Sequence, residues 1–137
     1  PLLAAALIRN ESLFDPRAHS PADARGLMQI IPPTARRLAT EVGFTDFELG
    51  DLFQPRINLT LGCHYLASLL TRYHDDVERA VASYNAGEDA VDRWTARDPS
   101  LKGAAFAETI PYAETRNYVR NVIRDWLRYR ELYLGAV

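Results

Sequence analysis

The sequence predicts an all-α domain, and three observations carry that prediction. Apolar residues recur with the 3.6-residue period of an α-helix along almost the whole chain. Prolines at the start and glycines at the end punctuate the periodic segments, as they do in helices. No run alternates apolar and polar residues as a half-buried strand would. The 137 residues suit a single domain with one core.

The first predicted helix spans Leu2–Ser12, and a loop over residues 13–31 follows it. Pro16, Pro21 and Gly26 punctuate this loop and exclude a continuous helix. A loop of this length inside a compact domain is uncommon and often carries function. We therefore expect functional residues in the loop or beside it.

Proline and glycine mark the next two helices. Pro33 lies at the start of the second helix and Gly43 at its end, and Pro55 opens the third. Apolar positions of the third helix recur every four residues, at Ile57, Leu61, Tyr65 and Leu69. The lone cysteine, Cys63, lies among apolar residues at helical spacing, so we expect a small buried side chain rather than a nucleophile.

Three further helices complete the predicted fold. The fourth is closed by Gly87 and has its apolar positions at Val77, Ala80, Val81 and Tyr84. A short fifth helix has Ala90, Val91 and Trp94 on one side. Pro111 opens a long last helix, whose inward positions are Val119, Val122, Ile123 and Trp126. No internal repeat, linker or low-complexity segment interrupts the series.

Composition and motifs argue against several classes of function. A net charge of −2 gives no electrostatic support for nucleic-acid binding. No apolar run approaches the roughly 20 residues that span a bilayer. His19, His64 and His74 lack metal-ligand spacing, and no serine has the context of a serine hydrolase. Because the chain begins at Pro1 without an initiator methionine or a signal peptide, we expect a domain cut from a longer protein.

Glu11 is the first candidate for chemistry. It lies on the same helical face as Ala4, Leu7 and Ile8, at the spacing of an apolar stripe. Partial burial raises the pKa of a glutamate, so that its carboxylic acid can donate a proton near neutral pH. The alternative is a helix-end glutamate that bends out to water.

A second group, Gly26, Met28 and Gln29, lies in the loop after the first helix. Glycine permits a close approach of the backbone to a ligand. Met28 and Gln29 offer a ligand an apolar wall and an amide. For Met28, the only methionine in the chain, the alternative is packing in the core.

Two further groups lie in the second half of the chain. At the end of the fourth helix, Tyr84 and Asn85 supply the planar ring and the amide that sugars bind, although an ordinary helix C-terminus also favours Asn and Gly. Glu108 lies just before the last helix, and Tyr118 lies one turn past Glu114. The helix dipole explains Glu114 but not Glu108, for which surface exposure is the alternative.

Four segments in this order resemble the catalytic domain of the soluble lytic transglycosylases, a lysozyme-like family that cleaves the glycan strands of peptidoglycan. The resemblance covers nearly the whole chain, and its segments are Ala6–Ser12, Ala24–Ile30, Ala82–Gly87 and Glu108–Val119, with Val91–Trp94 after the third. The last segment is similar to the large periplasmic branch of the family. The implied fold is a helical domain like goose-type lysozyme, with a substrate cleft, over residues 1–137.

The resemblance also implies roles for individual residues. Glu11 corresponds to the catalytic glutamate and Ser12 to its accompanying serine. Residues implied to contact the substrate are Met28 and Gln29 along the cleft, Tyr84, Asn85 and Ala86 as a sugar-binding wall, and Glu108 and Tyr118 closing the site.

The implied reaction breaks the β-1,4 bond between N-acetylmuramic acid and N-acetylglucosamine and leaves 1,6-anhydromuramic acid ends. Glu11 would protonate the leaving oxygen, while the acetamido oxygen of the sugar attacks in place of a second carboxylate. Glu11 would then take the proton of the muramyl 6-hydroxyl. Neither a cofactor nor a metal is expected.

The implied partners are peptidoglycan glycan strands, with no nucleic acid and no transmembrane segment. We expect a monomeric domain in the periplasm or cell envelope, with a flanking helical domain in the full protein. One alternative is a hydrolytic muramidase or chitinase on the same fold, with water replacing the 6-hydroxyl. A non-catalytic glycan-binding module is another, although a module that only binds does not need a partly buried acid such as Glu11.

Two residues depart from the family pattern. Asp23 stands where the family usually has glycine, and His19 replaces a usual aliphatic residue. Asp tolerates a positive φ better than most residues, so the turn should survive. Neither departure touches the proposed chemistry, but both could alter the packing of the loop.

Overall fold

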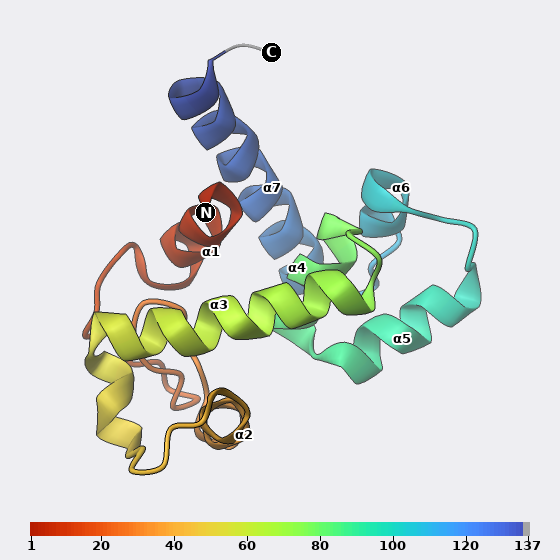
Figure 1. The fold of residues 1–137 in the computed structure, drawn as a ribbon. Helices are drawn as coiled ribbons and strands as arrows, with labels where there is room; N and C mark the ends of the chain where they lie inside the picture. The colour runs from red at the N-terminus through yellow and green to blue at the C-terminus, as the bar shows by residue number, and fades with distance from the viewer. Residues whose placement is uncertain (136–137) are drawn as a thin grey trace. The chain divides into compact units, whose positions relative to one another are not determined.

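The computed structural model describes residues 1–135, which form helices joined by loops (Figure 1). The elements are α1 (Leu2–Ser12), α2 (Pro32–Val42), the 3₁₀-helix η1 (Leu49–Phe53), α3 (Pro55–Arg72), α4 (Val77–Ala86), α5 (Glu88–Arg97), α6 (Gly103–Glu108) and α7 (Ala113–Leu134). Over these residues no strand forms, although isolated antiparallel bridges pair His19 with Arg25 and Arg25 with Ile30. The prediction of an all-α fold is confirmed.

Most predicted boundaries agree with the structure. The helix over Leu2–Ser12 is confirmed at both ends, and Pro55 opens α3 as predicted. The second helix begins one residue earlier than predicted, at Pro32, and Gly43 caps it with a φ of 83°. The last helix begins two residues after Pro111. The two shortest elements, η1 and α6, were not predicted from the sequence.

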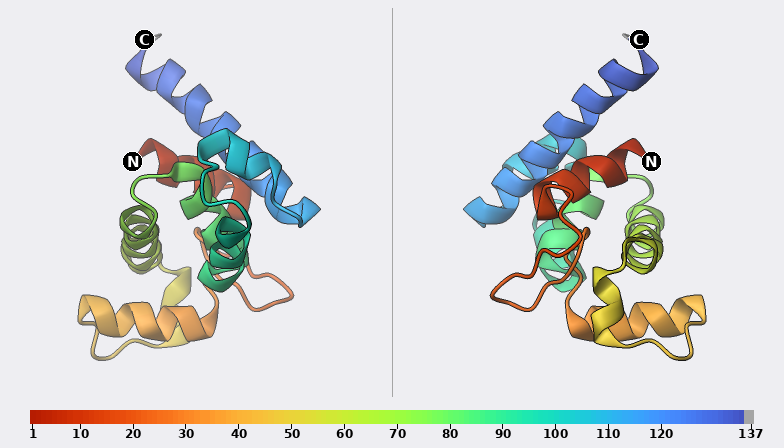
Figure 2. Two further views of the ribbon diagram at one scale, coloured as in Figure 1. Left: turned by 90° about the vertical axis from the view of Figure 1, so that its right-hand side faces the viewer. Right: turned by 90° about the vertical axis from the view of Figure 1, so that its left-hand side faces the viewer.

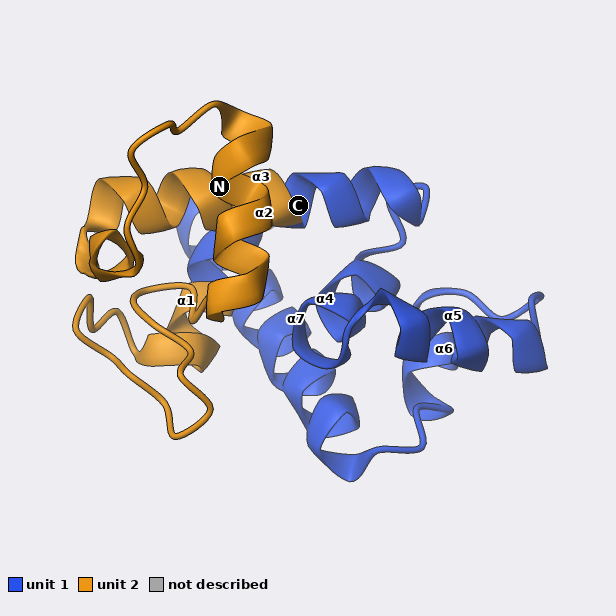
Figure 3. Cartoon of the chain, turned by 90° about the horizontal axis from the view of Figure 1, so that it is seen from below, with its two compact units in different colours: residues 1–6, 66–137 blue, residues 7–65 orange. Residues whose placement is uncertain are grey.

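The contacts within the chain divide it into two compact units (Figure 3), whereas the sequence predicted one core. We call residues 7–65 the loop unit, because the loop over 13–31 lies in it. Residues 1–6 and 66–137 form the helical unit, which contains α4 to α7.

In the helical unit, α4 is the central element and packs against α5, α6 and α7. Residues 79–83 of α4 are buried in succession, as expected for a helix that is covered on several sides. Trp94 of α5, Phe106 of α6 and Val122 of α7 are also buried. In both views of Figure 2, α6 lies beside α7, in agreement with the contacts between them.

The buried face of α3 includes only two of its four predicted positions. Leu61 and Leu69 are buried, as are Asn58, Gly62 and Leu66, whereas Ile57 and Tyr65 are only half-buried. A strict step of four residues drifts around a helix that has 3.6 residues per turn, so the four predicted positions do not share one face. Cys63 is exposed, so the prediction that it is buried was wrong.

No helix within residues 1–135 combines the length and the apolar character needed to cross a membrane.

Candidate active site

Glu11 lies at the boundary between interior and surface, in the last turn of α1. Its side chain is half-buried, while Leu7 and Ile8 on the same face are buried and Arg9 is exposed. The chain leaves the helix directly after Ser12, where Leu13 and Phe14 have positive φ values of 52° and 62°. Non-glycine residues rarely adopt this conformation. The structure therefore places Glu11 at a sharply ended helix, partly screened from water by its apolar neighbours.

Ser12 joins the end of α1 to the loop. Its hydroxyl lies 2.7 Å from the carbonyl oxygen of Leu27 and 3.2 Å from that of Ile8. A hydroxyl has one hydrogen to donate, and the shorter distance favours Leu27. The residue next to Glu11 is thus held by the backbone of the loop that follows.

Gln29 stabilises the loop from within. Its side-chain amide nitrogen donates to the carbonyl oxygens of Ala18, at 3.1 Å, and Gly26, at 2.9 Å. Its own φ is 50°, so the backbone turns tightly at this residue. Both amide hydrogens are used inside the loop, and only the amide oxygen of Gln29 is left to accept a hydrogen bond from a substrate.

Gly26 allows the loop backbone to approach other parts of the protein closely. Its φ is 78°, and a Cβ atom there would collide with the carbonyl oxygen of Leu52 and the amide of Asn58. From the sequence, this glycine was predicted to allow the backbone to approach a ligand closely. The structure shows instead that it lets the loop pack directly on η1 and α3.

Met28 is fully buried, and Gly62 of α3 makes room for it. A Cβ atom at Gly62 would overlap the Met28 sulfur. This packing corresponds to the core alternative weighed for Met28. A fully buried side chain cannot line a cleft, so any part of Met28 in substrate binding is indirect, through the position of the loop.

Asn58 was not predicted as a site residue, although it is fully buried and makes three hydrogen bonds. Its amide oxygen accepts from Met28 N at 2.8 Å, and its amide nitrogen donates to the carbonyl oxygens of Arg25 and Leu52, both at 2.9 Å. An amide on the buried face of an apolar helix is a signal that the sequence did offer, since such a group requires partners.

The two departures from the family pattern contact each other. His19 Nε2 lies 2.5 Å from Asp23 Oδ1, and Arg25 Nε donates to the same oxygen at 2.9 Å. The hydrogen bonds from Arg25 and His19 hold the pKa of Asp23 below its ordinary value. Asp23 has a φ of 65°, as the sequence analysis expected of an Asp in place of glycine. His19 also meets the ring of Phe53 edge to face.

In the helical unit, the end of α4 presents Tyr84, Asn85 and Ala86, and Gly87 follows with a φ of 89°. Asn85 is exposed, and its amide oxygen accepts a hydrogen bond from the buried Thr115 hydroxyl at 2.8 Å. Because this contact orients the amide, its NH₂ group is the part that remains to meet a ligand. Thr115 lies in a segment that carries the family resemblance, but nothing in the sequence indicates its contact with Asn85.

Glu108 and Tyr118 also belong to the helical unit. Glu108 ends α6 with its side chain 69% exposed and lies 3.6 Å from Arg120. An ion pair this exposed contributes little to stability. Tyr118, on α7, is half-buried, and its hydroxyl oxygen is shielded from solvent. The structure thus places Glu11, Ser12, Met28 and Gln29 in the loop unit and the other predicted site residues in the helical unit.

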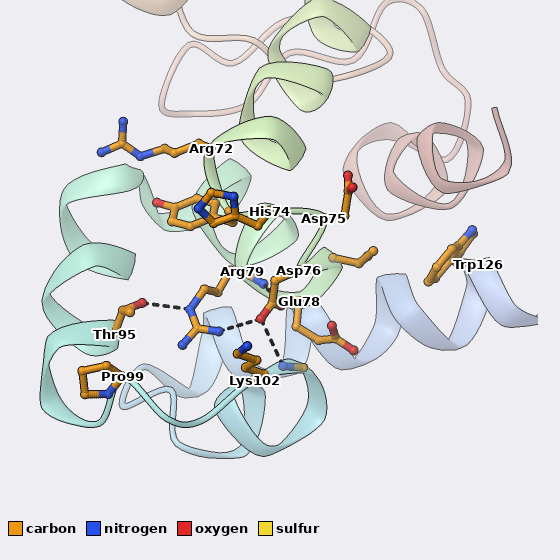
Figure 4. Close-up of a pocket in the computed structure, with 13 residues that line it drawn as sticks. Arg72, His74, Asp75, Asp76, Glu78, Arg79, Thr95, Pro99, Lys102 and Trp126 are labelled. Atoms are coloured by element: carbon orange, nitrogen blue, oxygen red, sulfur yellow. Dashed lines mark hydrogen bonds and ion pairs between the residues drawn. The ribbon is translucent and has the colours of Figure 1, made fainter.

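A pocket of about 600 Å³ lies within the helical unit (Figure 4), apart from the predicted site residues. The labelled residues that line it are Arg72, His74, Asp75, Asp76, Glu78, Arg79, Thr95, Pro99, Lys102 and Trp126. Figure 4 shows Arg79 between Thr95 and Asp76, to both of which it is hydrogen-bonded. These three polar groups of the lining thus bind one another. No cluster of His, Cys, Asp or Glu suited to a metal ion occurs within residues 1–135.

Comparison with known proteins supplies the identity of the fold. The profile of the family described as the transglycosylase SLT domain matches residues 1–107. The chain belongs to this family. The family resemblance and the lysozyme-like, all-α fold predicted from the sequence are both confirmed.

Three relatives illustrate the similarity. The soluble lytic murein transglycosylase of Salmonella typhimurium is 36% identical over 129 residues, which are 93% of this chain and 20% of that protein. The crystal structure of the 70-kDa soluble lytic transglycosylase from Escherichia coli matches with a TM-score of 0.91 and 34% identity, over 96% of this chain and 22% of that one. An inactive glutamate-to-glutamine mutant of the lytic transglycosylase Slt from Pseudomonas aeruginosa matches with a TM-score of 0.91 and 32% identity, over 99% and 22% of the two chains. This chain thus spans about a fifth of the length of these relatives.

The end of α4 gives a prediction that separates binding from stability. We expect Tyr84→Ala and Asn85→Ala to weaken saccharide binding more than they lower the melting temperature. Loss of one hydrogen bond at Asn85 corresponds to roughly a two- to tenfold weaker affinity. Calorimetric titration with chitooligosaccharides in a Glu11→Gln background, beside melting curves, measures both effects. An ordinary helix C-terminus would give the opposite pattern, with lower stability and unchanged affinity.

Proposed function

We propose that this chain is the catalytic domain of a lytic transglycosylase. Its substrate would be the β-1,4 bond between N-acetylmuramic acid and N-acetylglucosamine in peptidoglycan strands, and its product would carry a 1,6-anhydromuramic acid end. The observation that carries the proposal is the position of Glu11, half-buried beside Leu7 and Ile8 at the end of α1, in a member of the transglycosylase SLT domain family. The inactivity of a glutamate-to-glutamine mutant of the Pseudomonas relative supports an essential glutamate.

Glu11 would act first as a general acid and then as a general base. In the first step it gives its proton to the glycosidic oxygen, while the acetamido oxygen of the muramyl residue attacks C1 and the C1–O bond breaks. In the second step the muramyl 6-hydroxyl oxygen attacks C1, the acetamido group is released, and Glu11 takes the hydroxyl proton. No water is consumed, and the enzyme ends in the protonation state in which it began. Since the substrate supplies the nucleophile, one carboxylate suffices.

The other predicted residues would bind the glycan strand. Tyr84, Asn85 and Ala86 would form the sugar-binding wall, and Glu108 and Tyr118 would hold the muramyl ring away from water. Ser12 and Gln29 are hydrogen-bonded to the loop that also contains Met28, so their first effect is to fix its shape. A substrate contact of Gln29 would use its amide oxygen.

We also propose a setting for this domain. Because the chain spans about a fifth of its relatives, residues 1–137 would be a catalytic domain within a longer protein that includes a helical domain. Its partner would be the peptidoglycan strand, met by a monomeric domain in the periplasm or cell envelope. The relatives named as soluble and as membrane-bound murein transglycosylases support a cell-wall substrate.

The product distinguishes the proposed reaction from its alternatives. Well-oriented internal nucleophiles reach effective concentrations of roughly 10⁵–10⁸ M, far above that of water, so the 6-hydroxyl should win in a site that excludes water. We expect mass spectrometry of digested sacculi to show muropeptides that end in 1,6-anhydromuramic acid. These should be lighter by one water than the muropeptides that a muramidase releases from sacculi in a parallel digest. Reducing ends as the main product would identify a hydrolase. Binding without cleavage would identify a glycan-binding module.

A further inference from the structure

Asn58 is fully buried on α3, and hydrogen bonds of its side-chain amide connect α3 to the rest of the loop unit. Its oxygen accepts from Met28 N, and its two N–H groups donate to the carbonyl oxygens of Arg25 and Leu52, all at 2.8–2.9 Å. The contacts to Arg25 and Met28 bracket the two residues between them, Gly26 and Leu27. One rigid helix side chain therefore sets where Leu27 lies.

Leu27 in turn is hydrogen-bonded to the end of α1. Its carbonyl oxygen accepts the hydroxyl of Ser12 at 2.7 Å, and Ser12 is the neighbour of Glu11 in the sequence. The Leu27 carbonyl and the Met28 N–H belong to one planar peptide group, which therefore binds Ser12 on one side and Asn58 on the other. Asn58, this peptide group and Ser12 thus form a continuous path from α3 to the last turn of α1. Each step is a short contact of a buried or half-buried group, and all of them lie within the loop unit.

We infer that Asn58 is a positioning residue for the reaction, which acts through Leu27 and Ser12 to fix the geometry of Glu11. The inference rests on the proposed function, because it assigns Asn58 a part in the chemistry of Glu11. Asn58 itself does not touch the reacting atoms. Its effect is to keep the end of α1 and the loop in one relative arrangement while the acid changes its protonation state.

The shape of the surrounding residues supports this role. Gly26 has no Cβ, which would otherwise collide with the Asn58 amide, so the loop backbone rests directly on that side chain. A buried amide with all its partners satisfied specifies one arrangement, because any shift of the loop leaves a polar group unpaired. An apolar residue in place of Asn58 would leave the carbonyl oxygens of Arg25 and Leu52 without this donor.

The test compares Asn58→Ala with Leu38→Ala, each purified as the full 137-residue chain. Leu38 is a fully buried residue of α2 in the same unit and has no part in the path, so its variant controls for lost stability. Assays are run at a temperature where both variants are folded, and rates are expressed per folded molecule. We expect Asn58→Ala to lower kcat on the order of 10- to 100-fold, with KM within about twofold of wild type, as for small misplacements of a catalytic group. Leu38→Ala should keep the wild-type kcat.

A second variant, Ser12→Ala, keeps the inference testable should Asn58→Ala fold poorly, because Ser12→Ala alone should then lower kcat and move the Glu11 resonance, whereas Leu38→Ala should do neither. Ser12→Ala breaks the same path at its far end without disturbing the buried amide. Where Asn58→Ala folds, the double variant tests whether both residues act along one path. Its kcat should then be nearly that of the less active single variant, since the effects of substitutions at coupled residues do not add. Multiplied effects would show that Ser12 and Asn58 act separately, and would overturn the inference.

The side-chain carboxyl resonance of Glu11 in an NMR spectrum provides a measure that does not depend on turnover. We expect this resonance to move in Asn58→Ala and to stay in place in Leu38→Ala. An unmoved resonance, together with a wild-type kcat in Asn58→Ala, would assign Asn58 to stability alone. A wild-type chain that cleaves no glycan strand would refute the proposed function, and the Glu11 resonance would then decide the positioning role by itself.

Discussion

Glu11→Gln should lower the rate of glycan cleavage on the order of 10²–10⁴-fold while leaving the fold and saccharide affinity nearly unchanged. The glutamine side chain keeps the shape of the glutamate but has no proton to give to the leaving oxygen. Glu11 is only half-buried, so the exchange of a carboxyl for an amide should disturb the packing of α1 little. Release of soluble muropeptides from sacculi measures the rate, and calorimetry with chitooligosaccharides measures the affinity.

The matched control is Glu114→Gln, which removes the same charge from an exposed residue in the first turn of α7. We expect this variant to retain wild-type cleavage, because Glu114 has no role in the proposed site. Residual activity of Glu11→Gln above about a tenth of wild type would contradict the assignment, because general acid–base catalysis contributes far more than this. Glu108→Gln would then be the next variant to examine.

The sequence predicted the long helices well because their signals are local. The apolar spacing of Ala4, Leu7 and Ile8 lies within one helix. The end of α2 is marked by a single residue, Gly43, which can adopt the positive φ of a helix cap. The missed elements carry no such signal. With five residues in η1 and six in α6, neither completes two turns, so no apolar period can be recognised.

The same distinction applies to the candidate site. Glu11 could be found from the sequence because its position on an apolar face depends only on its own helix. The partners of Asn58 and Thr115 could not be predicted in this way, since each residue contacts a partner 30 residues away. The partners of Asn58 are moreover backbone groups, which every residue carries, so no pair of residue types marks the contact.

Arg79 gives the largest expected effect on stability, because it is a buried cation that joins four segments of the helical unit. Its Nη1 lies 2.6 Å from Asp76 Oδ2, its Nη2 donates to the Leu101 carbonyl oxygen at 2.6 Å, and its Nε donates to Thr95 Oγ1 at 3.0 Å. The guanidinium carbon also lies 4.2 Å from the centre of the Phe106 ring. One side chain thus connects the start of α4 with α5, with the loop after it and with α6.

We expect Arg79→Met to lower the free energy of unfolding by about 3–5 kcal/mol, the usual effect of removing one partner from a buried ion pair. Methionine fills much of the same space, so the effect arises mainly from the charge of Asp76, which is left in a site only 12% exposed. The matched control is Arg72→Met. Arg72 also binds a carboxylate, that of Asp92 at 2.7 Å, but its side chain is 51% exposed. An exposed pair contributes about 0–1 kcal/mol, so urea unfolding should separate the two variants clearly.

A double variant shows whether the unpaired charge is the cause. Asp76 caps α4 by accepting from Arg79 N at 3.1 Å, and asparagine caps helices about as well as aspartate. Asp76→Asn should therefore recover part of the stability lost in Arg79→Met, because it removes the buried carboxylate and keeps the cap. If the two substitutions change the free energy of unfolding additively, the stability lost in Arg79→Met comes from the contacts to Leu101, Thr95 and Phe106 instead of the ion pair. Equal stability of Arg79→Met and Arg72→Met would contradict the central role of Arg79 altogether.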